Sequence, residues 1–128
     1  MVTRLIGRKL GMSQIYDEKG RCFPCTVIEA GPCIVLQVKT KEQDGYAALQ
    51  IGFGERRRKS VSRPVLGHQV PKPEGQKPED RKKQFANDVK QLRPVQVIRE
   101  IPWDGKEAFK VGDKIGVGIF ETLKKVDV

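Results

Sequence analysis

The sequence predicts a mainly β-strand domain, either a barrel or a sandwich, on the basis of three observations. Short runs of apolar and β-branched residues recur along the chain, and turns rich in glycine and proline separate them. No apolar run approaches the ~20 residues that a membrane-spanning helix requires. The length of 128 residues suits one domain. We therefore expect residues 1–128 to form a single domain of antiparallel strands.

A β-hairpin is expected in the first thirty residues. Residues 8–16 end in β-favouring side chains, and residues 22–30 contain the β-branched run Thr26-Val27-Ile28. Between them, residues 17–20 end in a glycine, which can take the positive φ that a tight hairpin turn requires. The two runs are therefore predicted to pair through this turn.

Four further strands are expected beyond the hairpin, each next to a turn signal. In the first of them, Ile34, Leu36 and Val38 alternate and are expected on one face. Gly52 and Gly54 are interpreted as the end of the second. The expected strands are residues 33–41, 46–53, 95–101 and 114–120, with turns at 44–45, 103–105 and 111–113.

The middle of the chain, residues 55–93, differs from the strand regions in charge and proline content. It opens with Arg56-Arg57-Arg58-Lys59, and prolines at 64, 71, 73 and 78 interrupt regular structure. Its first part is therefore expected to be an extended basic arm or surface loop. Pro78 precedes two acidic residues, a typical helix start, and Phe85, Val89 and Leu92 form an apolar stripe. We predict a basic loop with one short helix, inserted in the β-domain.

The cysteines and the single histidine are the candidates for a metal site. Cys22 and Cys25 have the spacing of half a zinc site, but Cys33 and His68 each stand alone. Zinc sites of this type usually show two closely spaced pairs, and redox pairs usually sit at a helix N-terminus. We interpret the cysteines as small buried side chains and expect no metal or other cofactor.

No arrangement of residues typical of an enzyme is evident. His68 has no nearby nucleophile with an orienting carboxylate, and the acidic residues are scattered over turns. The chain has no Gly-Lys-Ser/Thr loop for phosphate binding. We expect no catalytic activity and no small-molecule substrate.

The net charge of +9 and the isoelectric point of about 9.7 indicate a polyanionic partner. A membrane surface would need a basic amphipathic helix or a lipid signal, and neither is evident. A soluble basic protein with no specific partner is the remaining alternative. Only 6% of the residues are aromatic, so stacking on rings is not expected to dominate binding. Nucleic acid is the partner that this composition favours.

Several ordered segments resemble the large-subunit ribosomal protein three family, the universal "L three" family, in its bacterial form. They are residues 5–16 (LIGRKLGMSQIY), 24–32 (PCTVIEAGP), 37–40 (QVKT), 44–54 (DGYAALQIGFG), 63–68 (RPVLGH), 111–113 (VGD) and 120–128 (FETLKKVDV). The resemblance implies an antiparallel β-barrel similar to that of translation factors. It also implies direct contact with large-subunit ribosomal RNA, neighbouring ribosomal proteins as partners, a cytoplasmic ribosomal location and an early part in subunit assembly.

The candidate RNA-binding residues are basic side chains spread along the chain, together with the histidine. They are Arg4, Arg8, Lys9, Arg56, Arg57, Arg58, Lys59, Arg63, His68, Lys72, Lys82, Lys83, Lys124 and Lys125. Arginine can grip a phosphate with two parallel N–H bonds, and lysine adds a mobile point charge. These residues are expected to bind the RNA backbone rather than to read its sequence.

Two features depart from the family pattern. Residues 70–92 are longer and more polar, so no family residues are transferred to them. Family members continue beyond the position of Val128 into a loop rich in glycine and lysine and then complete the barrel. We therefore expect the barrel to be incomplete at the C-terminus of these 128 residues.

Two alternatives to a ribosomal protein remain. One is a free-standing RNA-binding or translation-factor-like module, and the other is an enzyme such as a flavin-binding barrel.

Overall fold

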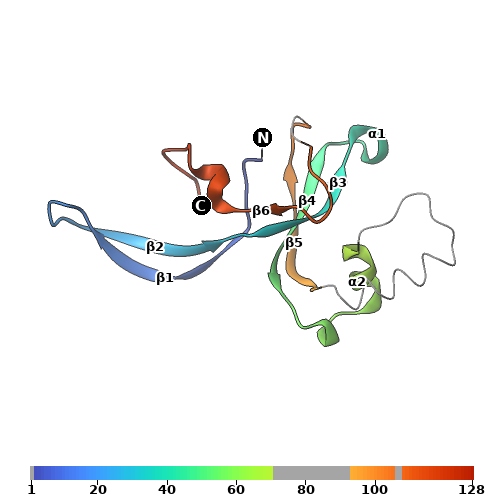
Figure 1. The fold of residues 1–128 in the computed structure, drawn as a ribbon, viewed down its shortest axis with the longest axis horizontal. Helices are drawn as coiled ribbons and strands as arrows, with labels where there is room; N and C mark the ends of the chain where they lie inside the picture. The colour runs from blue at the N-terminus through green and yellow to red at the C-terminus, as the bar shows by residue number, and fades with distance from the viewer. Residues whose placement is uncertain (1, 71–92, 106–107) are drawn as a thin grey trace.

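The computed structural model describes residues 2–70, 93–105 and 108–128, and the fold of these residues is mainly β (Figure 1). Two antiparallel sheets are present. The first pairs β1 (Gly7–Tyr16) with β2 (Cys22–Ala30). The second has the order β5-β4-β3-β6, with β3 at Cys33–Lys39, β4 at Ala48–Glu55, β5 at Val95–Pro102 and β6 at Lys114–Ile115. The β class is confirmed, but the sheets do not close into a barrel within the described residues.

The predicted hairpin is confirmed as a ribbon of β1 and β2 that projects away from the larger sheet (Figure 1). Its turn is held by Asp17, whose carboxylate accepts hydrogen bonds from the backbone N–H groups of Lys19 and Arg21, each at 2.9 Å. The backbone bond from Arg21 is the main reason that the pKa of Asp17 lies below its usual value. Gly20 takes a φ of 76°, which favours glycine.

Both faces of this ribbon carry exposed apolar side chains. Met12 and Tyr16 lie on one face and are 70% and 64% exposed. Ile15 pairs with Phe23 on the other face, and both are also exposed. Residues two apart on a strand share a face, so this arrangement follows directly from the pairing register.

The core lies on one face of the larger sheet. The central strand β4 contributes Leu49 and Ile51, both fully buried. Around them pack apolar residues from the neighbouring strands and from the N-terminal segment. The buried cluster consists of Val2, Cys33, Val35, Leu49, Ile51, Ile101 and Ile115.

The expected alternation in β3 is wrong beyond its first residues. A register shift between Val35 and Gln37 places an extra residue in the strand opposite β4. Such a bulge reverses the alternation, because the side chains after it point to the opposite face. Val35 before the bulge and Val38 after it therefore both contact the core, whereas Ile34 does not belong to the core cluster.

The strand expected at 46–53 is displaced to Ala48–Glu55, and its glycines lie inside the strand rather than at its end. A Cβ atom on Gly52 would lie 2.6 Å from Cγ2 of Val95, so the close approach of β5 explains the glycine. The preceding strand ends at Lys39, and α1 (Lys41–Asp44) follows it.

The strand expected at 95–101 is confirmed as β5, but the one expected at 114–120 is mostly wrong. Only Lys114 and Ile115 pair with β3, and a 3₁₀ turn, η2 (Val117–Phe120), follows. Gly116 and Gly118 provide no side chains to pack across a sheet, which weakens the strand there. Ile115 is buried, whereas Val117 is 58% exposed.

The basic arm expected after β4 is also wrong in part, because this segment is folded. A 3₁₀ turn, η1 (Arg58–Ser60), leads into the helix α2 (Arg63–Gln69). Pro64 lies in the first turn of α2, where a missing backbone N–H does not break a helix. The helix predicted after Pro78 lies outside the described residues. Within the described part, no helix is long and apolar enough to cross a membrane.

Candidate nucleic-acid interface

Five of the predicted residues follow β4, four on the connection to α2 and one at the first residue of α2, and all five are exposed. The turn η1 within this connection closes on itself, because the backbone N–H and the hydroxyl of Ser60 both donate to the carbonyl oxygen of Arg57, at 2.9 and 2.7 Å. The basic run therefore follows a bent path rather than an extended one. We call this group the arginine corner; it consists of Arg56, Arg57, Arg58, Lys59 and Arg63.

The structure adds Arg93 to this corner, a residue that the sequence pattern does not indicate. The backbone N–H of Arg56 donates to the carbonyl oxygen of Pro94 at 2.8 Å, which brings the start of β5 beside the corner. Arg93 is exposed and pairs with Glu55 at 3.3 Å. Both side chains are more than two-thirds exposed, so this ion pair contributes little stability and leaves the guanidinium accessible. Only the pairing of β4 with β5 reveals this neighbour.

A second basic group lies at the base of the ribbon. Arg4, Arg8 and Lys9 are exposed there, and Arg8 pairs with Glu29 at 3.0 Å. Lys124 and Lys125 are exposed in the C-terminal segment. The remaining predicted lysines, Lys72, Lys82 and Lys83, lie outside the described residues.

A groove of about 450 Å³ lies between the ribbon base and the ends of β4 and β5. Its charged lining residues are Arg8, Glu29, Glu55 and Lys114, so opposite charges balance. A phosphate would meet two carboxylates there. The arginine corner, where the basic side chains cluster, is therefore the stronger anion-binding surface.

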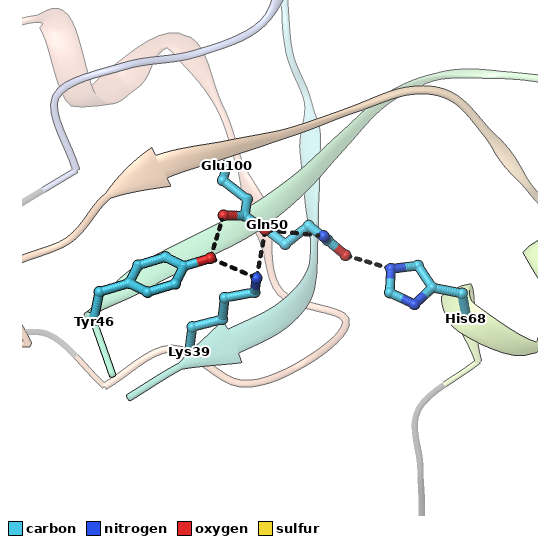
Figure 2. A network of polar contacts seen from close by, with 5 residues as sticks. All are labelled: Lys39, Tyr46, Gln50, His68 and Glu100. Carbon is cyan, nitrogen blue, oxygen red and sulfur yellow. Dashed lines mark hydrogen bonds and ion pairs between the residues drawn. The ribbon is translucent and has the colours of Figure 1, made fainter. Parts of the chain in front are cut away.

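His68 belongs to a network of polar contacts that joins α2 to the larger sheet (Figure 2). Its Nε2 lies 2.7 Å from Oε1 of Gln50, and Nε2 of Gln50 lies 3.5 Å from Oε1 of Glu100. The Tyr46 hydroxyl donates to Oε2 of Glu100 at 2.8 Å. Lys39 donates to the Tyr46 hydroxyl at 2.7 Å and pairs with Oε1 of Glu100 at 2.6 Å. We call these five residues the sheet–helix network.

The charges in this network hold each other in place. The hydrogen bond from Lys39 is the main cause of a pKa of Glu100 below its usual value. The same contact is the main cause of a pKa of Lys39 above its usual value. The Lys39 side chain is only 17% exposed, so its charge is directed at Glu100 rather than at solvent. The sequence pattern does not indicate this network, because its members come from β3, the turn after α1, β4, α2 and β5.

The three cysteines occupy different environments. Cys33 is buried, as expected, and burial raises the pKa of its thiol. Cys25 is half-buried, and Cys22 is exposed, so the prediction of a buried side chain is wrong for Cys22. Residues three apart on a strand point to opposite faces, which separates Cys22 from Cys25. Among the described residues, no group of three or more His, Cys, Asp or Glu side chains could hold a metal ion.

Comparison with known proteins gives similarity over the whole chain. No family model matches it. The chain is 40% identical over all 128 residues to "Large ribosomal subunit protein uL3" of Pelotomaculum thermopropionicum, covering 52% of that protein. The proteins of the same name from Carboxydothermus hydrogenoformans and Prochlorococcus marinus are 42% and 44% identical, again over 128 residues. The chain spans about half the length of the curated relatives it matches. The chain thus belongs to the uL3 family and corresponds to the N-terminal part of its bacterial members.

Proposed function

We propose that this protein is a structural component of the large ribosomal subunit in the cytoplasm, that it binds large-subunit ribosomal RNA directly, and that it acts early in subunit assembly. Neighbouring ribosomal proteins are its other partners, and it carries out no catalysis. The observation that carries this proposal is the identity of 40–44% to bacterial proteins named large ribosomal subunit protein uL3 along essentially the whole chain.

The arginine corner supports RNA binding as the physical basis of this role. Its side chains are exposed and lie on a bent, hydrogen-bonded connection, with Arg93 beside them. Exposed guanidinium groups can bind phosphates with two parallel hydrogen bonds each. We propose that the corner binds the RNA backbone, that the ribbon-base residues Arg4, Arg8 and Lys9 form a second contact, and that Lys124 and Lys125 add to it. Residues 55–93 then act as a basic insertion in an RNA-binding domain.

We also propose that the two sheets are part of a β-barrel similar to that of translation factors, which strands outside these 128 residues would complete. The exposed apolar faces of the ribbon support this, since further strands would cover them. Among the described strands, β5 lies at one end of the sheet order, and its outer edge could pair with another strand.

Co-sedimentation with bacterial large ribosomal subunits tests the proposed function. A resident protein should remain with the subunits after washing in about 0.5–1 M salt, where surface phosphate contacts alone are strongly screened. The alternative, a free-standing RNA-binding or translation-factor-like module, should wash off. Complete release in moderate salt would therefore argue against a structural role.

A further inference from the structure

We propose that the sheet–helix network positions α2, and with it the arginine corner, for RNA binding. Lys39, Tyr46, Gln50, His68 and Glu100 are positioning residues in this proposal and make no contact with RNA themselves. The inference rests on the proposed function, because it assumes that the corner binds RNA.

The network has a defined direction, because its central acceptor can only accept. An ionised carboxylate has no hydrogen to donate, so Glu100 must receive hydrogen bonds from Tyr46 and Gln50. Lys39 can only donate, and it donates to the Tyr46 hydroxyl. Lys39, Tyr46 and Glu100 thus form a closed set of contacts, and Gln50 links Glu100 to the imidazole of His68 (Figure 2).

The orientation of Gln50 fixes the state of His68. Because the amide NH₂ of Gln50 faces Glu100, its carbonyl oxygen faces the histidine. Nε2 of His68 must then carry a hydrogen and donate it across the 2.7 Å contact. A carboxylate on β5 thus selects the tautomer of a histidine on α2.

Two further attachments complete the hold on α2. The backbone N–H of Val95 donates to Oε1 of Gln69 at 3.0 Å, and Gln69 is 3% exposed. Leu66 and Val70 are also buried. The helix is therefore bound to β4 through His68 and to β5 through Gln69.

The arginine corner lies between two fixed points. At its start, the backbone of Arg56 bonds to Pro94, and at its end the chain enters α2 at Arg63. A shift of α2 would move the end of the corner relative to its start. Phosphates have fixed spacing along an RNA backbone, so such a shift should reduce the number of phosphates that the corner can bind at once.

The substitution Glu100→Gln separates this proposal from simple electrostatics. It raises the net charge by one, from +9 to +10. If only charge mattered, RNA should bind equally well or more tightly. If the network positions the corner, binding should weaken by roughly three- to tenfold, because the substitution disrupts a charge-assisted hydrogen-bond network. Every basic side chain is still present in this variant.

The matched control is Glu42→Gln, which makes the same charge change on α1. Glu42 is exposed and makes none of the contacts of the sheet–helix network. Both variants are titrated with a bacterial large-subunit ribosomal RNA transcript across a salt series. A positioning role predicts a shallower dependence of log K on log salt for Glu100→Gln, by about 0.7–0.9 for each phosphate that the protein no longer binds, and no change for the control.

The salt slope separates repositioning from a loss of folding once the folded fraction has been measured at each salt concentration. A folded fraction that is smaller by the same factor at every salt concentration would lower the apparent affinity, but the molecules that bind would neutralise the same phosphates and give the same slope. Tyr46→Phe, which removes only the bridging hydroxyl, should weaken binding in the same direction and by less. The proposal is overturned if Glu100→Gln has the affinity and slope of Glu42→Gln.

A nuclear magnetic resonance measurement tests the network without RNA. At a pH of about 8, in a sulfate buffer that favours the folded state, the ring nitrogens of His68 should report the Nε2–H tautomer in the unaltered protein. In Glu100→Gln the signal should move toward a mixture of tautomers. An Nδ1–H tautomer in the unaltered protein would refute the network. If the tautomer is as expected but the protein does not bind the transcript, the proposed function is wrong, whereas the hydrogen bonds of the network are confirmed.

Discussion

Gly52 shows how one residue without a side chain permits the pairing of β4 with β5. A Cβ atom at this position would lie 2.6 and 2.9 Å from the two methyl carbons of Val95. Val95 is buried, so it has little room to move. We expect Gly52→Ala to destabilise the fold by about 1–3 kcal/mol, the usual cost of overpacking a tight site. The measurement is the midpoint of urea unfolding, made in a sulfate buffer that favours the folded state.

Gly11→Ala is the matched control for this prediction. Gly11 also lies inside a strand, but nothing lies within 4 Å of where its Cβ would be. Alanine there should leave stability unchanged or raise it by up to about 1 kcal/mol, because glycine loses more conformational entropy on folding. Equal destabilisation by both substitutions would show that the contact with Val95 is not the cause.

Gly52 also illustrates what sequence reasoning misses at the scale of a residue. The pattern predicts a strand end there, because a glycine inside a strand and a glycine after one look alike in sequence. The deciding neighbour, Val95, lies on another strand and far along the chain. Asp17 and Gly20, by contrast, act through residues within the same turn, so their role is predictable from the sequence.

At the scale of elements, the arginine corner gives a direct prediction about RNA. Replacing Arg56, Arg57, Arg58 and Lys59 with alanine should weaken RNA binding and flatten its salt dependence. The slope of log K against log salt should fall by about 0.7–0.9 for each phosphate that the variant no longer binds. The measurement is a binding titration at several salt concentrations with a large-subunit ribosomal RNA transcript.

The control for the corner removes four positive charges elsewhere. Alanine at the exposed residues Lys19, Lys41, Arg99 and Lys110 lowers the net charge of +9 by the same amount. Long-range attraction should then fall equally in both variants, but the slope should fall further in the corner variant. Identical slopes in the two variants would show that the corner faces solvent in the complex.

Elements are predictable from the sequence where local chemistry decides the structure. The hairpin of β1 and β2 follows from a turn flanked by β-favouring runs, and β5 follows from a short run of apolar and β-branched residues. The helix α2 escapes prediction because Pro64 resembles a helix breaker, although proline also suits the first turn of a helix. The strand expected at 114–120 is too long. Its alternating apolar residues predict a strand, but the glycines between them leave one face of that strand without side chains.

At the scale of the whole molecule, the site depends on how strands pair rather than on any motif. Arg93 joins the corner, and Glu100 reaches Tyr46 and Lys39, only because β5 lies beside β4 and β4 beside β3. The sequence indicates a basic surface, but it does not indicate which residues form that surface. Long-range pairing is the information that composition and spacing lack.

The exposed surface of the ribbon bears on the stability of the 128-residue chain without RNA. Much of the ribbon is apolar and exposed, including Leu10, Met12 and Ile15 at 59–70% exposure. Exposed apolar faces and open strand edges favour aggregation, and a charge of +9 adds self-repulsion. Both effects act against a domain that typically has only ~5–15 kcal/mol of stability.

We expect the isolated chain to be marginally folded or prone to aggregation in low salt. We expect a polyanion to order it, because a ligand of the folded state stabilises that state. Thermal melting with and without RNA is the measurement. A sharp cooperative transition above about 60 °C without RNA, near the upper end of the ordinary range, would show that the ribbon and sheet need no further cover.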